Sequence, residues 1–247
     1  MAVIGYMPLH YGKEYLQWAL KSMDIADVIH IFYTEKPSYG HWTTYPCPEN
    51  EAELKEIALQ FPKVKWHAVS GKNREGDHRN MVLEYCTDDD FMVTLDSDEV
   101  MHPGHWEAAL SEAGRQTYSS YGINGFVNFW KSFNHVVKDG FQPVRIARPK
   151  YRRQMSQGRV DATIYHFGYA QREEVMAYKL AIHGHLGDIR NVHGSPENYF
   201  NKWKSWTHPG CGVNHLHPAS RDIWIDAEPF DKTNLPDILK DHPYYEL

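Results

Sequence analysis

Cysteine is scarce in this 247-residue chain, which contains only Cys47, Cys86 and Cys211. Their odd number and wide spacing exclude a disulfide framework and a CxxC zinc site. Long apolar runs are also missing, since none approaches the ~20 residues that a membrane-spanning helix needs. The first residues, MAVIGYMPLHYGKEYL, lack the basic and then apolar regions of a signal peptide. These absences predict a cytoplasmic protein without a membrane span.

An excess of positive charge is lacking as well. The formal net charge is -6 and the isoelectric point is about 6.2, so no general attraction to nucleic acid or acidic membranes is expected. One stretch departs from this balance, because residues 145 to 159 contain no acid. Its basic residues permit a local basic face: Arg145, Arg148, Lys150, Arg152, Arg153 and Arg159.

Apolar runs alternate with amphipathic segments over the first hundred residues. Helices are expected at 12–23, at about 54–61, and from Asp77, as a cap, to about Cys86. The Pro- and Gly-containing segment 35–49 is expected to be a loop. Four strands separated in this way indicate a mostly parallel sheet with helices on both faces. These strands are predicted at residues 2–7, 28–34, 64–69 and 91–95.

The second half of the chain has a different pattern. A helix is expected after Pro103, and strands at 123–131 and 142–148 follow without a helix between them. This pattern predicts a mixed or antiparallel second half of the sheet. A strand at 163–169 and helices at 171–183 and about 196–206 complete the prediction. No linker divides the chain, so residues 1–247 are expected to form a single α/β domain.

The stretch FMVTLDSDEV at residues 91–100 joins a buried strand to three acids: Asp96, Asp98 and Glu99. Open α/β sheets bind ligands at the carboxyl ends of their strands. Mg²⁺ and Mn²⁺ often bind through one or two carboxylates together with substrate phosphates. We therefore expect Asp96 and Asp98 to hold a metal–diphosphate, with Asp98 the more direct ligand. Asp96 binds the metal directly, binds it through water, or points an oxygen toward a ribose.

Together these features resemble family-2-like glycosyltransferases of the GT-A fold, which use nucleotide sugars and include phage-encoded enzymes. A first strand runs into Pro8, and Arg79 with Asn80 precedes the acid strand. LDSDE matches the D-x-D element of those enzymes. YHFGY at 165–169, followed by a helix with Glu174, Met176 and Lys179, resembles their late H-x-G, M, K element. The similarity covers residues 1–183.

The resemblance implies a set of donor-site residues and a metal. His166 becomes a third metal ligand beside Asp96 and Asp98, and the metal is Mn²⁺ or Mg²⁺, with imidazole better suited to Mn²⁺. Residues 1–100 become the half that binds the nucleotide sugar, with a UDP-sugar expected. Residues 101–247 become the acceptor-side half with a C-terminal extension. The implied donor contacts are Pro8, Glu35 for the base, Asp77, Arg79, Asp96, and Lys179 for phosphate.

The catalytic base and the acceptor stay open at this stage. An inverting reaction needs a carboxylate that takes the acceptor proton, and Glu99 and Asp161 are the candidates. A retaining reaction needs no such base. The usual acceptors of the enzymes that this chain resembles are saccharides, lipids or proteins, and a hydroxymethylated base in phage DNA is a further alternative. The basic run would contact DNA phosphates in that last case. A phage enzyme would act in the host cytoplasm.

Two other classes of function compete with this interpretation. A metal-dependent hydrolase would use the acids with the HxH pairs His183-His185 and His215-His217, whose spacing resembles that of zinc ligands. A non-catalytic sugar-binding module would use LDSDE structurally. Several aromatic side chains could stack on a sugar or a base, or could pack in the core instead. They are Trp130, Phe133, Trp203, Trp206 and Trp224.

Overall fold

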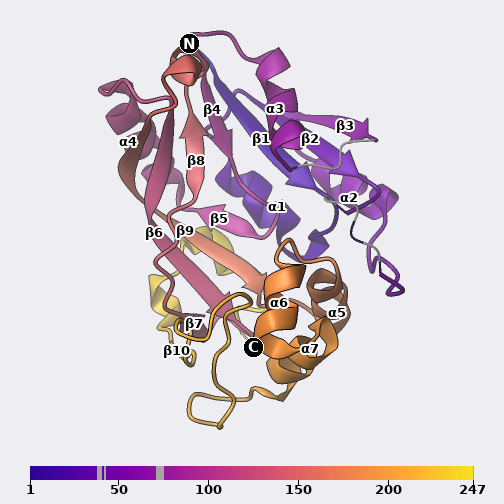
Figure 1. The fold of residues 1–247 in the computed structure, drawn as a ribbon. Coiled ribbons are helices and arrows are strands. Elements are labelled where there is room, and N and C mark those ends of the chain that lie inside the picture. The colour runs from indigo at the N-terminus through magenta and orange to yellow at the C-terminus, as the bar shows by residue number, and fades with distance from the viewer. Residues whose placement is uncertain (38–40, 42, 71–74, 247) are drawn as a thin grey trace.

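The first half of the chain forms a parallel sheet, as expected. The structure is a computed structural model that describes residues 1–37, 41, 43–70 and 75–246, so part of the predicted loop 35–49 lies outside it (Figure 1). The strands lie side by side in the order β4-β1-β2-β3, and all neighbours are parallel. Their bounds are β1 Val3–Leu9, β2 Val28–Thr34, β3 Val64–Val69 and β4 Phe91–Thr94.

The second half extends the same sheet with mixed pairing. β8 pairs antiparallel with both β4 and β6, and the two long strands β6 and β9 run parallel to each other. The predicted fold class, α/β with a parallel first half and a mixed second half, is therefore confirmed. The bounds are β5 Glu99–Met101, β6 Ser120–Trp130, β7 His135–Val137, β8 Val144–Ala147, β9 Gln157–Tyr169 and β10 Glu228–Pro229.

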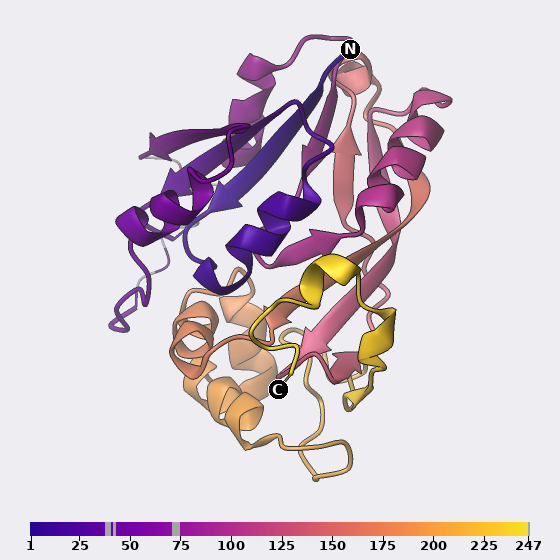
Figure 2. The ribbon, with the colours of Figure 1, turned by 180° about the vertical axis from the view of Figure 1, so that it is seen from behind.

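The helices lie in two groups. α1 Lys13–Ser22, α2 Glu51–Ala58 and α4 Pro103–Gly114 cover one face of the sheet (Figure 2). The second group lies beyond the ends to which β1 and β2 point (Figure 1). It consists of α5 Glu173–Ala181, α6 Leu186–His193 and α7 Pro196–Ser205. None of the helices in the described ranges is long and apolar enough to cross a bilayer.

The helix before the acid strand differs from the prediction. α3 covers Glu75–Asn80 and continues as a 3-10 helix over Met81–Tyr85. Asp77 thus lies inside the first turn, and its expected role as the N-terminal cap was wrong. Further 3-10 turns are Pro149–Gln154, Lys232–Asn234 and Asp237–Leu239.

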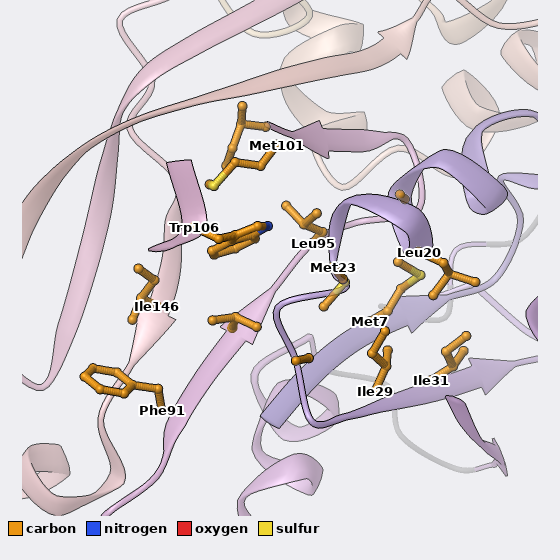
Figure 3. Packing of buried hydrophobic residues seen from close by; sticks show 14 of the residues in the cluster. Met7, Leu20, Met23, Ile29, Ile31, Phe91, Leu95, Met101, Trp106 and Ile146 are labelled. Atoms are coloured by element: carbon orange, nitrogen blue, oxygen red, sulfur yellow. The ribbon is translucent and has the colours of Figure 1, made fainter. Parts of the chain in front are cut away.

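A continuous apolar core fixes the position of the acid stretch. Met7, Leu95 and Trp106 are fully buried between the sheet and the helices α1 and α4 (Figure 3). Each such side chain stabilises the fold by about 1.5–3 kcal/mol. Leu95 directly precedes Asp96, so the core holds the backbone at the point where the acids begin.

The aromatic residues considered as stacking platforms lie in the interior instead. Trp130, Trp203, Trp206 and Trp224 pack together around α5, α6 and α7, and Phe133 packs with Tyr15 and Phe167 behind β6 and β9. All five are at most 5% exposed. All five rings therefore pack in the core, and Trp224 also lines a pocket that is described below.

The C-terminal segment returns to the first helix. His242 stacks on Tyr15 with ring centroids 4.8 Å apart, and Asp241 accepts a hydrogen bond from the indole of Trp18 at 3.0 Å. Leu239 is fully buried in the same cluster. The segment for which the sequence suggested no role thus covers part of α1.

Candidate active site

Two adjoining pockets open at the carboxyl ends of the parallel strands. The first, here called the strand-end pocket, has a volume of about 260 Å³ and lies at the ends of β1, β2 and β4. The second, the side pocket, has about 760 Å³ and lies toward β6 and the segment between β7 and β8. Asp96 and His166 line both pockets. The strand-end pocket is lined by Pro8, Leu9, His10, Tyr11, Thr34, His78, Asp96, Ser97, Asp98, His166 and Lys179.

Asp98 is the most tightly held acid of the strand-end pocket. Its residue is 8% exposed, Lys179 Nζ on α5 lies 3.0 Å from its Oδ2, and His166 Nε2 on β9 lies 3.8 Å from its Oδ1. Burial raises the pKa of Asp98, but the charge and hydrogen bond of Lys179, together with His166 once it is protonated at low pH, outweigh burial and lower the pKa to about 2. Asp98 is therefore a carboxylate at neutral pH, available as a hard oxygen ligand.

Gly168 makes this convergence of side chains sterically feasible. A Cβ atom at position 168 would lie 2.4 Å from Nε2 of His166 and 2.7 Å from Nζ of Lys179. No real Cβ atom tolerates such contacts, so any larger residue here would displace both side chains. Steric space therefore explains why the residue at position 168 in YHFGY is a glycine, which the sequence alone did not explain.

His166 has a fixed orientation and an uncharged ring. Its Nδ1 hydrogen-bonds to Oδ1 of Asn128 at 2.9 Å, and the ring stacks on Phe126. Burial is the main reason why its pKa falls to about 4. A neutral imidazole can donate an electron pair to a metal, and its Nε2 faces Asp98.

The donor set fits a divalent cation that shares its coordination with a substrate. Asp98 Oδ1 and His166 Nε2 are two electron-pair donors 3.8 Å apart. Among the described residues no group of three His, Cys, Asp or Glu side chains could hold a metal ion. Mg²⁺ and Mn²⁺ commonly take only one or two protein ligands and complete their shell with phosphate and water. Asp98 and His166 match that mode of binding.

Asp96 faces arginines rather than the Asp98–His166 pair. Arg145 Nη2 lies 3.0 Å from its Oδ2, and Arg79 Nη2 lies 3.8 Å from its Oδ1. Arg79 thus lies beside an acid of the metal loop. Arg79 also lines a hollow beside the side pocket, together with Phe141 and Arg145.

Glu99 and Arg145 form a buried ion pair beneath Asp96. Arg145 donates from Nε to Oε2 at 2.7 Å and from Nη2 to Oε1 at 2.5 Å, and the Asp96 backbone N–H donates to Oε2 at 3.1 Å. Burial raises the pKa of Glu99, whereas the guanidinium facing both of its oxygens favours the ionised form. Glu99 lines the side pocket but is only 1% exposed, and both of its oxygens already accept hydrogen bonds from Arg145. Its geometry is that of an anchor for Arg145.

The remaining predicted donor contacts divide into two groups. Pro8 and Lys179 line the strand-end pocket. Glu35, one residue beyond β2, and Asp77 are exposed, and neither of these two side chains lines either pocket. His10, which the sequence did not single out, hydrogen-bonds to the Thr34 carbonyl and to the Tyr178 hydroxyl, both at 2.7 Å.

The side pocket contains a carboxylate that the sequence did not single out. Asp139 follows β7 and lines this pocket with Asn128, Arg145 and His166. Its Oδ1 accepts the backbone N–H of Phe141 at 2.9 Å, and its Oδ2 faces Nδ2 of Asn128 at 3.4 Å. Within the described part of the chain, no lysine or arginine pairs with it. The only sequence signal was an acid in the turn KDG after a strand.

Asp161 lies away from both pockets. It is exposed on β9, and its backbone N–H donates to Glu112 on α4. Five residues of strand separate it from His166, which corresponds to about 16 Å. The geometry therefore gives no support to Asp161 as a base.

The histidine pairs do not form a zinc site among the described residues. His183, His185 and His217 line the side pocket. Both ring nitrogens of His183 are already engaged, because Nδ1 accepts the His185 N–H at 3.1 Å and Nε2 contacts the Tyr169 hydroxyl at 3.3 Å. The metal-dependent hydrolase built on these pairs therefore lacks its metal site.

The basic run does not form one face beside the pockets. Arg145 is buried in the site, and Arg148 covers Phe91 and donates to the Gln116 carbonyl. Lys150 and Arg152 lie near Asp89 and Asp88 at 3.6 and 3.1 Å. These two acids precede β4, whereas Asp96 and Asp98 follow it. The basic residues therefore do not gather beside the pockets, because Arg145 lies at one end of β4 and Lys150 and Arg152 lie at the other.

The chain belongs to a known family of transferases. The model of glycosyl transferase family 2 matches residues 49–178, more than half of the chain. This match confirms the family-2 resemblance predicted from Arg79, LDSDE and the YHFGY element, and it makes the chain a glycosyltransferase. A comparison with curated protein sequences found no match.

Solved structures are similar at low identity. TarS residues 1–349 from S. aureus share 12% identity with a TM-score of 0.46, covering 82% of this chain and 69% of that one. Glucosyl-3-phosphoglycerate synthase from Mycobacterium tuberculosis, solved with Mn²⁺, UDP and phosphoglyceric acid, shares 11% with a TM-score of 0.46, covering 74% and 78%. A 4-diphosphocytidyl-2C-methyl-D-erythritol synthase shares 11% with a TM-score of 0.43, covering 73% and 97%. The assignment rests on the family match.

Proposed function

We propose that this protein is a metal-dependent glycosyltransferase that moves a sugar from a nucleotide sugar, with UDP as the expected nucleotide, to a hydroxyl of an acceptor. The observation that carries the proposal is the convergence of Asp98, His166 and Lys179 at the carboxyl end of β4 in a family-2 chain. Two electron-pair donors and one ammonium in a single pocket suit a metal–diphosphate.

The donor is expected in the strand-end pocket. A divalent ion held by Asp98 and His166 would neutralise the diphosphate that leaves. Lys179 already lies 3.0 Å from Asp98, and its ammonium is close enough to reach a phosphate oxygen on the same side of the pocket. Arg145 keeps Asp96 in place at the wall shared by the two pockets. The nucleoside is expected toward Pro8, His10 and Thr34.

Asp139 is our candidate for the general base, in place of Glu99 and Asp161. It lines the pocket that adjoins the donor pocket, and its carboxylate has no cationic side chain among the described residues. The acceptor hydroxyl gives its proton to Asp139, and its oxygen attacks the anomeric carbon. The bond from that carbon to the phosphate oxygen breaks, and its electron pair leaves with the nucleoside diphosphate. This single displacement inverts the anomeric centre.

The side pocket favours a saccharide as the acceptor. Phe141 lines this pocket and is 57% exposed. Its ring lies edge-on to that of Phe126, with the ring centroids 5.5 Å apart. An exposed aromatic ring beside carboxylate, amide and imidazole groups suits a sugar, which has an apolar ring face and a rim of hydroxyls. A DNA acceptor needs a continuous basic surface for the phosphates, and the run from Arg145 to Arg159 provides none beside the pocket.

Thermal denaturation with UDP, with and without Mn²⁺, tests the donor site. A ligand at one hundred times its Kd stabilises the folded state by about 2.7 kcal/mol, which corresponds to roughly 5–10 °C for a chain of this size. Asp98→Ala should abolish the Mn²⁺-dependent part and leave the fold intact. Absence of Mn²⁺-dependent stabilisation by UDP and by every other nucleoside diphosphate would contradict the proposal.

Asp139→Asn separates donor binding from transfer. The variant should retain the stabilisation by UDP and Mn²⁺, while transfer to acceptors from a saccharide panel falls by about 10²–10⁴-fold. Asp161→Asn is the matched control, because it makes the same change on the same protein outside both pockets. If Asp139→Asn keeps wild-type turnover, the assignment of the base is wrong.

A further inference from the structure

A buried amide joins the two pockets. Asn128 on β6 is 1% exposed. Its Oδ1 lies 2.9 Å from Nδ1 of His166, and its Nδ2 lies 3.4 Å from Oδ2 of Asp139. On the far side of the imidazole, Nε2 of His166 lies 3.8 Å from Oδ1 of Asp98. A continuous row of side chains thus runs from the carboxylate of the side pocket to the carboxylate of the strand-end pocket.

The hydrogen-bonding capacity of each group determines which side chain donates and which accepts at each step of this row. An ionised carboxylate only accepts hydrogen bonds. The side of the Asn128 amide that faces Asp139 must therefore be its NH₂ group. The carbonyl oxygen then faces His166, and because an amide oxygen only accepts, Nδ1 of His166 must carry the ring proton. A neutral imidazole has one N–H, so Nε2 holds an electron pair directed toward Asp98.

We propose that Asn128 is a positioning residue that holds His166 in the Nδ1–H tautomer, and that Asp139 sets the orientation of Asn128. The roles given to His166 and Asp139 rest on the function proposed above. In this tautomer, Nε2 of His166 and Oδ1 of Asp98, which face each other at the wall of the strand-end pocket, are both electron-pair donors. Two such atoms repel each other unless a cation lies close to both, so the row prepares a cation site. The opposite tautomer would direct a proton at Asp98 and block coordination by Nε2.

The same row connects the acceptor side of the site to the donor side. A residue that orients a metal-binding histidine through its other nitrogen typically changes metal affinity by 10–100-fold when it is replaced. Here the orienting amide itself touches the candidate base. Asparagine suits this position, since its amide offers a donor to Asp139 and an acceptor to His166 at once.

Nitrogen NMR of the full-length wild-type protein measures the tautomer directly. The imidazole signals of His166 are assigned by their loss in His166→Gln, and the shifts of protonated and unprotonated ring nitrogens differ clearly. The expected result is a protonated Nδ1 and an unprotonated Nε2 in the metal-free protein at pH 7. A protonated Nε2 in the wild type would overturn the proposal without any need for a variant.

Two substitutions at position 128 separate positioning from structure. Asn128→Leu keeps the volume but removes the acceptor, so Mn²⁺ affinity, measured by titration in the presence of UDP, should fall 10–100-fold. Asn128→Asp keeps an acceptor for the Nδ1 proton and should keep Mn²⁺ affinity within about threefold of the wild type, although it faces Asp139 with like charge. A folded Asn128→Leu variant with unchanged Mn²⁺ affinity would refute the positioning role.

These measurements distinguish a failure of the proposed glycosyltransferase function from a failure of the positioning role proposed for Asn128. Wild-type protein that binds neither Mn²⁺ nor a nucleoside diphosphate would contradict the proposed function, while the tautomer still decides the role of Asn128. If Asn128→Leu does not fold, the wild-type spectrum and the spectrum of Asn128→Asp carry the test. A mixture of tautomers in Asn128→Asp would also count against the proposal.

Discussion

Replacing Arg145 by leucine should show how strongly folding stability depends on the buried ion pair between Glu99 and Arg145. Arg145 and Glu99 have side chains that are 7% and 2% exposed, and the guanidinium donates two hydrogen bonds to the carboxylate. The substitution leaves Glu99 buried without its countercharge. Breaking such a pair typically costs about 3–5 kcal/mol of folding free energy.

An independent estimate follows from protonation. In Arg145→Leu the folded protein can avoid the buried charge by protonating Glu99. For a carboxyl group with an unfolded-state pKa of about 4.3, this costs about 3.7 kcal/mol at pH 7 and about 1 kcal/mol at pH 5. The folded-state pKa of Glu99 is raised in this variant, so folding binds a proton and the variant gains stability as the pH falls. Burial raises the pKa of Glu99 in the wild type as well, where Arg145 opposes that shift. The stability gap to the wild type should therefore narrow between pH 7 and pH 5, by less than about 2.7 kcal/mol.

Urea denaturation followed by circular dichroism at both pH values measures this gap. The double variant Arg145→Leu with Glu99→Gln is the matched control, because it removes the ionisable group. It should be more stable than Arg145→Leu at pH 7 and should show no narrowing at pH 5. A loss of less than about 1 kcal/mol in Arg145→Leu at pH 7, against the 3–5 expected for a broken buried pair, would refute this reasoning. A gap that does not change with pH would refute it as well.

Two further substitutions test the strand-end pocket. Lys179→Met removes the ammonium that helps to lower the pKa of Asp98 to about 2; the wild type loses this stabilisation as the pH falls from about 4 toward 2. The stability gap between the variant and the wild type should therefore narrow over that range in thermal denaturation, and parallel curves would contradict the expectation. Gly168→Ala would bring a Cβ within 2.4 Å of His166 Nε2, so Mn²⁺-dependent binding of UDP should weaken at least tenfold. Gly187→Ala, where a Cβ meets nothing within 4 Å, is its control, and equal UDP affinities in the two alanine variants would disprove the steric argument.

The position of the acids could be predicted from the sequence because its causes are local. Phe91 to Leu95 form an apolar run that must be buried, and the carboxylates that follow must therefore lie at the end of a buried strand. Parallel strands bring their carboxyl ends to one edge. This edge holds Asp96 and Asp98, as predicted, and brings Pro8 to the same pocket. The family match then agreed with the motifs quoted from the sequence.

The partners of those acids depended on strand register, which the sequence does not display. In β9, His166 is paired with Glu99 on one side and with Asn128 on the other. A shift by one residue would turn His166 to the opposite face of the sheet. Tertiary pairing also brought β8 beside β4, which set Arg145 under Asp96 and removed it from the predicted basic face. The positive charge of Arg145 alone could not show whether this residue lies under Asp96 or on a basic surface.

The sequence by itself thus determined the α/β fold class and one wall of the site, because apolar periodicity and acids after a buried strand are properties of short segments. The family came from the resemblance of its motifs, with which the family match agrees. Only the tertiary structure decided that Glu99 anchors an arginine and that Asp139 faces the second pocket. It also decided that Asn128 joins the two pockets. The physical reason is that burial and hydrogen-bond partners come from segments far apart in the chain, and a residue's chemistry follows from them.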